Sequence, residues 1–104
     1  MVTPAQGEIW WAETDEHKRR PVLVVTRSHA VPVLYAILVA PVTRTVRNVS
    51  TEIHLGQQTG LRQPCVASFD NLQRIPRGLL TERVGALSFE PLEICRALAA
   101  LADC

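Results

Sequence analysis

Residues 21–27 read Pro-Val-Leu-Val-Val-Thr-Arg, and this stretch decides the fold. It is short, apolar and dense in β-branched side chains. A longer apolar run follows at residues 33–42 (Val-Leu-Tyr-Ala-Ile-Leu-Val-Ala-Pro-Val), after a turn at residues 28–32. Runs of this kind are typical of strands buried in the middle of a sheet. We therefore predict two central strands, which a hairpin between them would make antiparallel neighbours.

Further strands are predicted on both sides of this central pair. Residues 7–13 are rich in β-formers, and residues 50–55 alternate polar and apolar side chains. Another strand is expected at residues 64–69, and the same alternation continues through residues 70–75. Polar loops at residues 14–20 and 56–64 separate these segments. The pattern predicts a sheet of about five strands.

One amphipathic helix is predicted at the end of the chain. Ser88 is the candidate N-cap, Glu90 suits the positive end of the helix dipole, and Pro91 is tolerated in the first turn. Apolar side chains then recur at helical spacing, at Leu92, Cys95, Leu98, Ala99 and Ala102. Several strands followed by one helix predict a mainly β fold: a small, strongly curved antiparallel barrel or sheet with the helix packed against it.

Length and composition indicate one folded domain over residues 1–104. The longest apolar stretch, residues 31–42, is too short to cross a bilayer, and the N-terminus lacks the basic and apolar regions of a secretory signal. We therefore expect the protein in the cytoplasm. The three cysteines, Cys65, Cys95 and Cys104, form no closely spaced pair, which predicts two buried thiols and a loose C-terminal one rather than disulfides or a zinc site.

The net charge of +1 conceals a strong segregation along the chain. Between His17 and Thr51 no residue is acidic, and six are basic: Lys18, Arg19, Arg20, Arg27, Arg44 and Arg47. Because phosphate affinity depends on the local field rather than on total charge, this basic window favours a binding site for a polyanion. The alternative is a solvated basic loop.

The chemistry of RNA cleavage needs a group that removes the 2′ proton, cationic donors for the phosphate, and a proton for the leaving 5′-oxygen. No spacing links the three histidines, the carboxylates are too scattered for a metal or cofactor site, and no Gly-rich phosphate loop is present. Arg20 and Thr43 remain, at the start of one central strand and the end of the next, and neighbouring antiparallel strands would bring them close together. The alternatives are an ion pair of Arg20 with Asp15 or Glu16, and an ordinary strand-end hydroxyl at Thr43.

Four segments together resemble one protein family, in the same order and spacing over nearly the whole chain. They are residues 7–13 (Gly-Glu-Ile-Trp-Trp-Ala-Glu), 20–25 (Arg-Pro-Val-Leu-Val-Val), 40–43 (Ala-Pro-Val-Thr) and 70–75 (Asp-Asn-Leu-Gln-Arg-Ile). The chain resembles the MazF/PemK family of toxin endoribonucleases. The resemblance implies an SH3-like barrel with a C-terminal helix, a homodimer, and metal-independent cleavage of single-stranded RNA that leaves a 2′,3′-cyclic phosphate and a 5′-hydroxyl.

The resemblance also implies functional residues and a partner. Arg20 and Thr43 match the catalytic pair of the family, and an antitoxin whose C-terminal segment covers the RNA groove is expected. We expect further RNA contacts from seven residues: Trp10, Trp11, Lys18, Arg19, Arg44, Gln73 and Arg74. Trp10 and Trp11 alternate along one strand, so one must face the core and the other the opposite side. The loop at residues 14–19 is shorter than is usual in the family.

Two other functions are compatible with the same fold. A toxin of this shape can poison DNA gyrase by binding it, although the chain lacks the Trp-Gly-Ile ending associated with that class. A non-catalytic RNA- or peptide-binding barrel is the second alternative, because a fold does not determine a function. The effect of removing Arg20 distinguishes these two from an enzyme.

Overall fold

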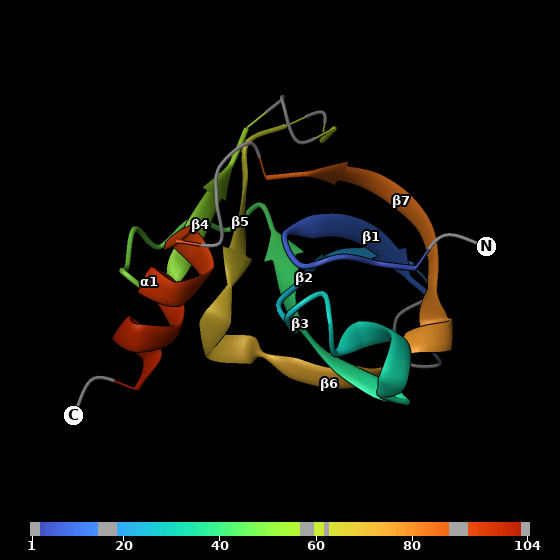
Figure 1. The fold of residues 1–104 in the computed structure, drawn as a ribbon. Coiled ribbons are helices and arrows are strands. Elements are labelled where there is room, and N and C mark those ends of the chain that lie inside the picture. Colours follow the sequence, from blue (N-terminus) through green and yellow to red (C-terminus); the bar gives the residue numbers. More distant parts are fainter. Residues whose placement is uncertain (1–2, 15–18, 57–59, 62, 88–91, 103–104) are drawn as a thin grey trace.

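A computed structural model describes residues 3–14, 19–56, 60–61, 63–87 and 92–102. This part of the chain forms one strongly curled antiparallel sheet, with a helix packed beside one end of it (Figure 1). The elements are β1 (Glu8–Ala12), β2 (Arg20–Val24), β3 (Ala36–Thr43), β4 (Glu52–Leu55), β5 (Cys65–Ser68), β6 (Gln73–Pro76), β7 (Leu80–Ala86) and α1 (Leu92–Leu101). The predicted fold class, a mainly β curved sheet with a C-terminal helix, is confirmed.

The two apolar runs form the centre of the sheet, as predicted. The strand order is β4-β5-β3-β2-β1-β7, and β6 also pairs with β3. β2 and β3 are antiparallel neighbours with Val22 opposite Pro41 and Val24 opposite Val39. The longer run becomes a strand only from Ala36, because a 3₁₀ turn at Val31–Val33 precedes it.

One edge of β3 pairs with two strands in succession, which corrects the prediction of a continuous strand over residues 64–75. The first half of β3 pairs with β6, and its last residues, Val42 and Thr43, pair with β5. A 3₁₀ turn at Phe69–Asn71 separates β5 from β6. It lies where β3 contributes Ala40 and Pro41, and Pro41 has no N–H to donate to a ladder.

The sheet formed by the described residues has seven strands rather than the predicted number of about five. β6 is a separate strand, and β7 was not predicted at all. β7 lies at the edge beside β1, so three of its residues, including the consecutive charged pair Glu82 and Arg83, are exposed. An edge strand with this pattern lacks the clean alternation that identifies a strand from sequence.

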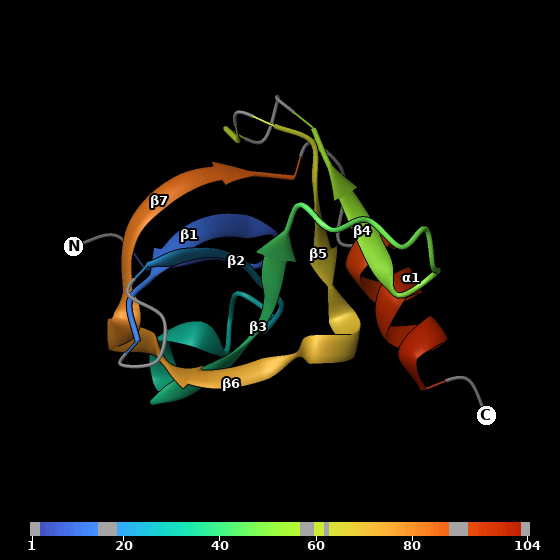
Figure 2. The ribbon, with the colours of Figure 1, turned by 180° about the vertical axis from the view of Figure 1, so that it is seen from behind.

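The curled sheet buries apolar side chains on both faces, which explains why its central strands are continuously apolar. The helix-side core contains Ile9, Leu23, Val25, Ala40, Val42, Ile53, Leu55, Cys65, Ala67, Phe69, Ile94 and Ala97. The second core, within the curl, contains Trp10, Ala12, Val22, Val24, Val31, Ile37, Val39, Ile75 and Leu80. Figure 2 shows α1 beside β4 and β5, far from β7.

The helix α1 is present, but its buried face differs from the predicted one. Ile94 and Ala97 are its buried residues, whereas Leu92 is 75% exposed. Cys95 is exposed, so the expectation of two buried thiols holds only for Cys65. The predicted cap residues Ser88, Glu90 and Pro91, and also Cys104, lie outside the described residues. No helix in the described ranges is long and apolar enough to span a membrane.

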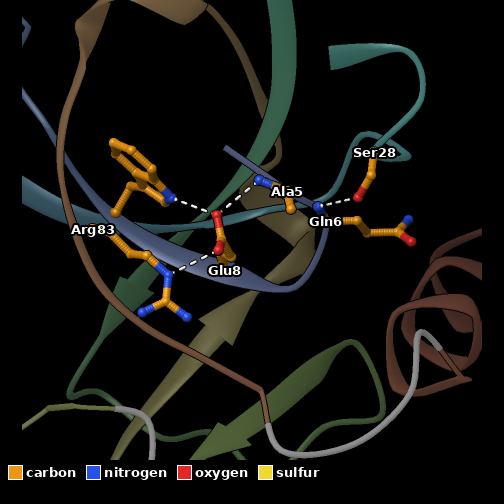
Figure 3. Close-up of polar contacts among 6 residues, drawn as sticks. Ala5, Gln6, Glu8, Ser28 and Arg83 are labelled. Atoms are coloured by element: carbon orange, nitrogen blue, oxygen red, sulfur yellow. Dashed lines mark hydrogen bonds and ion pairs between the residues drawn. The ribbon is translucent and has the colours of Figure 1, made fainter. Parts of the chain in front are cut away.

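The carboxylate of Glu8 joins the N-terminal turn, β1 and β7 (Figure 3). One oxygen accepts hydrogen bonds from the Ala5 amide (2.8 Å) and from Trp10 Nε1 (3.0 Å), and the other accepts one from Arg83 Nε (2.8 Å). We call Ala5, Glu8, Trp10 and Arg83 the Glu8 cluster. Burial alone would raise the pKa of Glu8, but the hydrogen bonds from Trp10, Arg83 and Ala5 and the charge of Arg83 lower it below its ordinary value of 4.5.

Candidate active site

The register of the central strands brings Arg20 and Thr43 together. Strands β2 and β3 pair from Val22 opposite Pro41 to Val24 opposite Val39. If this register is extended by two residues beyond Val22 and Pro41, Arg20 falls opposite Thr43. Both side chains line the same two hollows in the surface. Together these two hollows form what we call the groove.

The larger part of the groove has a volume of about 540 Å³ and mostly apolar walls, and we call it the apolar hollow. Leu61 lines it next to Gly60, which has a φ of +91° and packs so closely against Val84 that a Cβ would lie only 2.5 Å from the backbone oxygen. The lining consists of Trp11, Arg20, Pro21, Val42, Thr43, Arg44, Leu61, Gln63 and Cys65.

The smaller part has a volume of about 260 Å³ and we call it the polar hollow. It is lined by Arg20, Pro41, Thr43, Thr45, Arg47, Ser68, Asn71 and Gln73. Three of these, Ser68, Asn71 and Gln73, come from the break between β5 and β6 and its flanks, and Asn71 Nδ2 donates a hydrogen bond to Ser68 Oγ (3.0 Å). Amide side chains of this kind can read the edges of unpaired bases.

The groove carries positive charge without a compensating acid. Its described lining contains Arg20, Arg44 and Arg47 but no Asp, Glu or His. Within the described part of the chain, no hydrogen bond or ion pair engages the guanidinium of Arg20 or of Arg47, and Arg44 Nη1 donates only to the neutral Gln63 Oε1 (2.8 Å). Three cations with no carboxylate partner suit an anionic ligand.

A buried carboxylate shapes the loop that carries Arg47. Glu52 is 3% exposed and accepts hydrogen bonds from the backbone amides of Arg47 (3.1 Å) and Asn48 (3.0 Å). Asn48 adopts a positive φ of 59°, which Asn tolerates better than most residues. Because Glu52 binds the backbone of Arg47, the guanidinium remains available to the polar hollow.

The hydroxyl of Thr43 accepts one hydrogen bond from a described residue, and this leaves its own proton free to be donated. Thr43 Oγ1 accepts a hydrogen bond from the Thr45 amide (3.1 Å). The hydroxyl proton is therefore available for a second partner. A fork of N–H donors at Arg20 and an O–H donor at Thr43 can together hold the oxygens of one phosphate group.

Five of the seven other residues expected to contact RNA fall into three groups. Trp11, Arg44 and Gln73 line the groove. Arg19 lies beside it, where it forms an ion pair with Glu82 (2.9 Å) and covers the Trp11 ring. Lys18 lies outside the described residues, as do Asp15 and Glu16, the alternative ion-pair partners of Arg20.

The structure places the other two residues, Trp10 and Arg74, outside the described lining of the groove. Trp10 is 5% exposed within the second core and donates its indole N–H to Glu8, so it is a core residue and Trp11 is the tryptophan of the groove. Arg74 follows Gln73 on β6 and therefore points to the opposite face of the strand, where it pairs in register with Leu38. It does not line the groove.

Several lining residues were not singled out from the sequence. Arg47 belongs to the basic window and Asn71 to the segment at residues 70–75, so both carried a signal. Thr45, Leu61 and Gln63 lie in loops, where no periodicity indicates which side chain turns toward a neighbouring strand.

Comparison with known proteins gives a consistent result over the whole described chain. The family model for the PemK-like, MazF-like toxin of type II toxin-antitoxin systems matches residues 5–102. A probable endoribonuclease, MazF5 of Mycobacterium tuberculosis, is 38% identical over 104 residues, which cover 97% of this chain and 94% of that protein.

Solved structures agree with the sequence matches. The Mycobacterium tuberculosis toxin MazF-mt6 superposes with a TM-score of 0.77 at 38% identity, covering 92% of this chain and 93% of that one. A mycobacterial endoribonuclease in complex with its cognate antitoxin superposes with a TM-score of 0.75 at 20% identity, covering 95% and 91%. The second likeness concerns the fold alone.

Proposed function

The chain belongs to the PemK/MazF family of toxins of type II toxin-antitoxin systems, and on this premise we propose that it is an endoribonuclease that cuts single-stranded RNA in the groove. One observation carries the proposal. Arg20, with no partner in the described part of the chain, lines the groove together with Thr43, and the described lining has three arginines and no acid. This arrangement supports binding of a phosphodiester with its charge held at the Arg20 and Thr43 pair.

The proposed reaction is a transesterification within the RNA. The ribose 2′-oxygen attacks the adjacent phosphorus, the bond from phosphorus to the 5′-oxygen breaks, and the products carry a 2′,3′-cyclic phosphate and a 5′-hydroxyl. The 2′ proton is lost to a base, and a proton is delivered to the leaving 5′-oxygen. No metal or other cofactor is part of the proposal.

Arg20 and Thr43 act on the phosphate in this scheme. The Arg20 guanidinium donates to the non-bridging oxygens, whose negative charge grows in the pentacoordinate transition state, and the Thr43 hydroxyl donates to one of them. A guanidinium is essentially always protonated, so Arg20 is a poor base and serves as a cationic donor. The base is not assigned to any described residue.

The proposal includes a protein partner and a second subunit. A cognate antitoxin would cover the groove, and the unpaired arginines there suit an acidic segment. A homodimer is supported by apolar side chains that remain uncovered, since Val33 is 79% and Tyr35 81% exposed. We expect the toxin to act in the cytoplasm, where single-stranded RNA is accessible.

The test is to incubate the purified protein with a long single-stranded RNA in excess EDTA and to map the product ends. We expect discrete cuts with 5′-hydroxyl ends, and a rate lowered by about 100-fold or more in Arg20→Ala. Arg27→Ala is the matched control, because Arg27 is exposed beyond the far end of β2 and lines neither hollow. It should cleave at close to the wild-type rate.

Other results would favour the other functions. RNA that stays intact across varied sequences would overturn the proposal and favour a gyrase poison or a binding barrel. Cleavage by Arg20→Ala at the wild-type rate would remove Arg20 from the mechanism. Equal losses of RNA binding and cleavage in Arg20→Ala would mean that Arg20 binds RNA without a further role in catalysis.

A further inference from the structure

Three side chains from neighbouring strands are stacked and paired beside the groove. Arg19 directly precedes β2, Trp11 lies on β1 and Glu82 on β7. The guanidinium carbon of Arg19 lies 4.7 Å from the centroid of the Trp11 ring, and Arg19 Nη2 lies 2.9 Å from Glu82 Oε1. Trp11 and Glu82 are also partners in the register between β1 and β7.

Trp11 borders the apolar hollow, whereas Arg19 and Glu82 do not. Arg19 covers one face of the Trp11 ring, and Trp11 lines the same hollow as Arg20 and Thr43. An aromatic ring in this position is suited to stacking on an unpaired base. The cation above it makes the ring less free to change its rotamer.

Arg19 and Arg20 differ in whether their guanidinium groups have an acidic partner. Arg19 forms an ion pair with Glu82, and the side chains of the two residues are 48% and 62% exposed, respectively. Arg20 has no partner among the described residues. An exposed ion pair of this kind contributes little to stability. Its geometric effect is to hold the guanidinium over the ring rather than to offer a free charge to phosphate.

We infer that Arg19 and Glu82 are positioning residues that hold Trp11 as a stacking surface for one base next to the phosphate that is cleaved. The inference rests on the proposed function, since it assumes that single-stranded RNA occupies the groove. It gives Arg19 a role different from the phosphate contact expected from sequence. It also gives Glu82, an acid, a favourable role in binding a polyanion.

Glu82→Gln distinguishes the two roles of Arg19 by the sign of its effect. If Arg19 were a phosphate ligand, loss of the carboxylate would release its charge and tighten RNA binding. If Arg19 positions the ring, the same substitution loosens the guanidinium and weakens binding. We expect KM for RNA to rise about 3- to 10-fold, with kcat within about two-fold of wild type. The rise in KM should be smaller than the roughly 5- to 150-fold that loss of one stacked base would cause, because the ring itself remains.

The remaining variants complete the test. Trp11→Ala should raise KM by roughly 5- to 150-fold and Trp11→Phe by much less, because a phenyl ring still stacks. Arg19→Met should behave as Glu82→Gln does, and Arg19→Lys should restore part of the loss because it keeps a cation near the ring. Arg27→Met is the control for removal of one positive charge and should leave KM unchanged. Thermal unfolding of each variant checks that it is folded.

Binding is measured alongside cleavage, with an oligonucleotide whose 2′-hydroxyls are replaced by hydrogen so that it cannot be cut. Its Kd should rise in Arg19→Met and Glu82→Gln in parallel with KM. A wild type that cleaves RNA while both variants keep its KM and Kd, or a Kd that falls in Glu82→Gln, would overturn the inference and leave the proposed function standing. A wild type that neither cleaves RNA nor binds the oligonucleotide would overturn both.

Discussion

Two regions of the surface are hollow and lined with arginines, and they differ in what those arginines contact. One is the groove, with parts of about 540 and 260 Å³. The other, which we call the β7 hollow, has a volume of about 850 Å³ and lies between the N-terminal segment, the 3₁₀ turn at Arg77–Leu79 and β7. Its lining comprises Thr3, Pro4, Trp10, Pro32, Arg77, Gly78, Leu80, Thr81, Glu82 and Arg83.

Every charged side chain of the β7 hollow has a partner. Arg77 Nη1 donates to the Val31 carbonyl (2.7 Å), Arg83 Nε to Glu8 (2.8 Å), and Glu82 accepts from Arg19 (2.9 Å). In the groove the guanidinium groups of Arg20, Arg44 and Arg47 form no ion pair with a described acid. The proposed functional site is therefore not the larger hollow but the one whose arginines lack an acidic partner. Arginines therefore stabilise the fold at the β7 hollow, whereas in the groove their guanidinium groups are available to a ligand.

This difference predicts that substitutions in the groove reduce activity and substitutions at the β7 hollow reduce stability. The largest effect is expected from Thr43→Val, which keeps the shape of the side chain and removes its O–H donor. We expect kcat to fall about 100- to 1,000-fold, as when one transition-state donor is lost, with the unfolding midpoint nearly unchanged. Single-turnover cleavage and urea unfolding measure the two quantities. Thr43→Val that cleaves within two-fold of wild type would contradict the comparison.

The next effect should appear at the Glu8 cluster and only in stability. Glu8→Gln replaces a carboxylate that accepts three hydrogen bonds, one of them from Arg83, with an amide that also presents donors. We expect the free energy of unfolding to fall by about 1–3 kcal/mol with kcat unchanged. Glu93→Gln, which breaks an exposed pair with Arg96 on α1, is the control and should cost about 0.5 kcal/mol or less. Equal losses in both variants would mean that the cluster has no special role.

At low pH the wild type should lose the greater stability that Glu8 gives it over the Glu8→Gln variant. Because the pKa of Glu8 in the folded protein is lowered, its contribution to stability is fully present above the unfolded value of 4.5 and is lost as the pH falls through the folded pKa. The difference in unfolding free energy between wild type and Glu8→Gln should be constant from neutral pH down to about that value and shrink below it. A difference that grows on acidification would refute the assigned direction of the shift.

The smallest effect is expected from Arg47→Ala, on the salt dependence of RNA binding. It distinguishes a residue that contacts phosphate from the proposed catalytic pair in the same groove. Each phosphate contact on a single strand contributes about 0.7 to the slope of log K against log salt. Arg47→Ala should therefore flatten the slope for an uncleavable RNA by about 0.7, with kcat less affected than in Thr43→Val. Arg27→Ala should leave the slope unaltered. An unchanged slope in Arg47→Ala would show that its guanidinium contacts no phosphate.

The parts of the fold that sequence predicted are those where local pattern and tertiary environment agree. β2 and β3 are buried on both faces, so a continuous apolar run identified them, and their adjacency was enough to associate Arg20 with Thr43. β7 has an exposed stretch containing Glu82 and Arg83, so its pairing with β1 left no pattern to detect. The break at Phe69–Asn71 depends on where Pro41 falls across the sheet, which only the register reveals.

Side-chain direction was the other information that sequence lacked. Alternation requires Trp10 and Trp11 to face opposite ways, but only the packing of the second core decides that Trp10 is the buried one. The face of α1 was misjudged for a similar reason, since Ile94 and Ala97 are buried while Leu92, which is as apolar as Ile94, is exposed. Arg19 could not be separated from Arg20 by residue type, because a paired and an unpaired arginine look the same in a sequence.

The break between β5 and β6 has a consequence for how such a protein can diverge. Asn71 and Gln73 reach the polar hollow from the break and from the first residue of β6, whereas Arg20 begins β2 and Thr43 ends β3, strands that pair with each other. Substitution at the break alters the surface presented to a base without disturbing the register that aligns the pair. Under the proposed function, target preference and chemistry would therefore be encoded in separable parts of one sheet, and a variant could change what it recognises while retaining how it cuts.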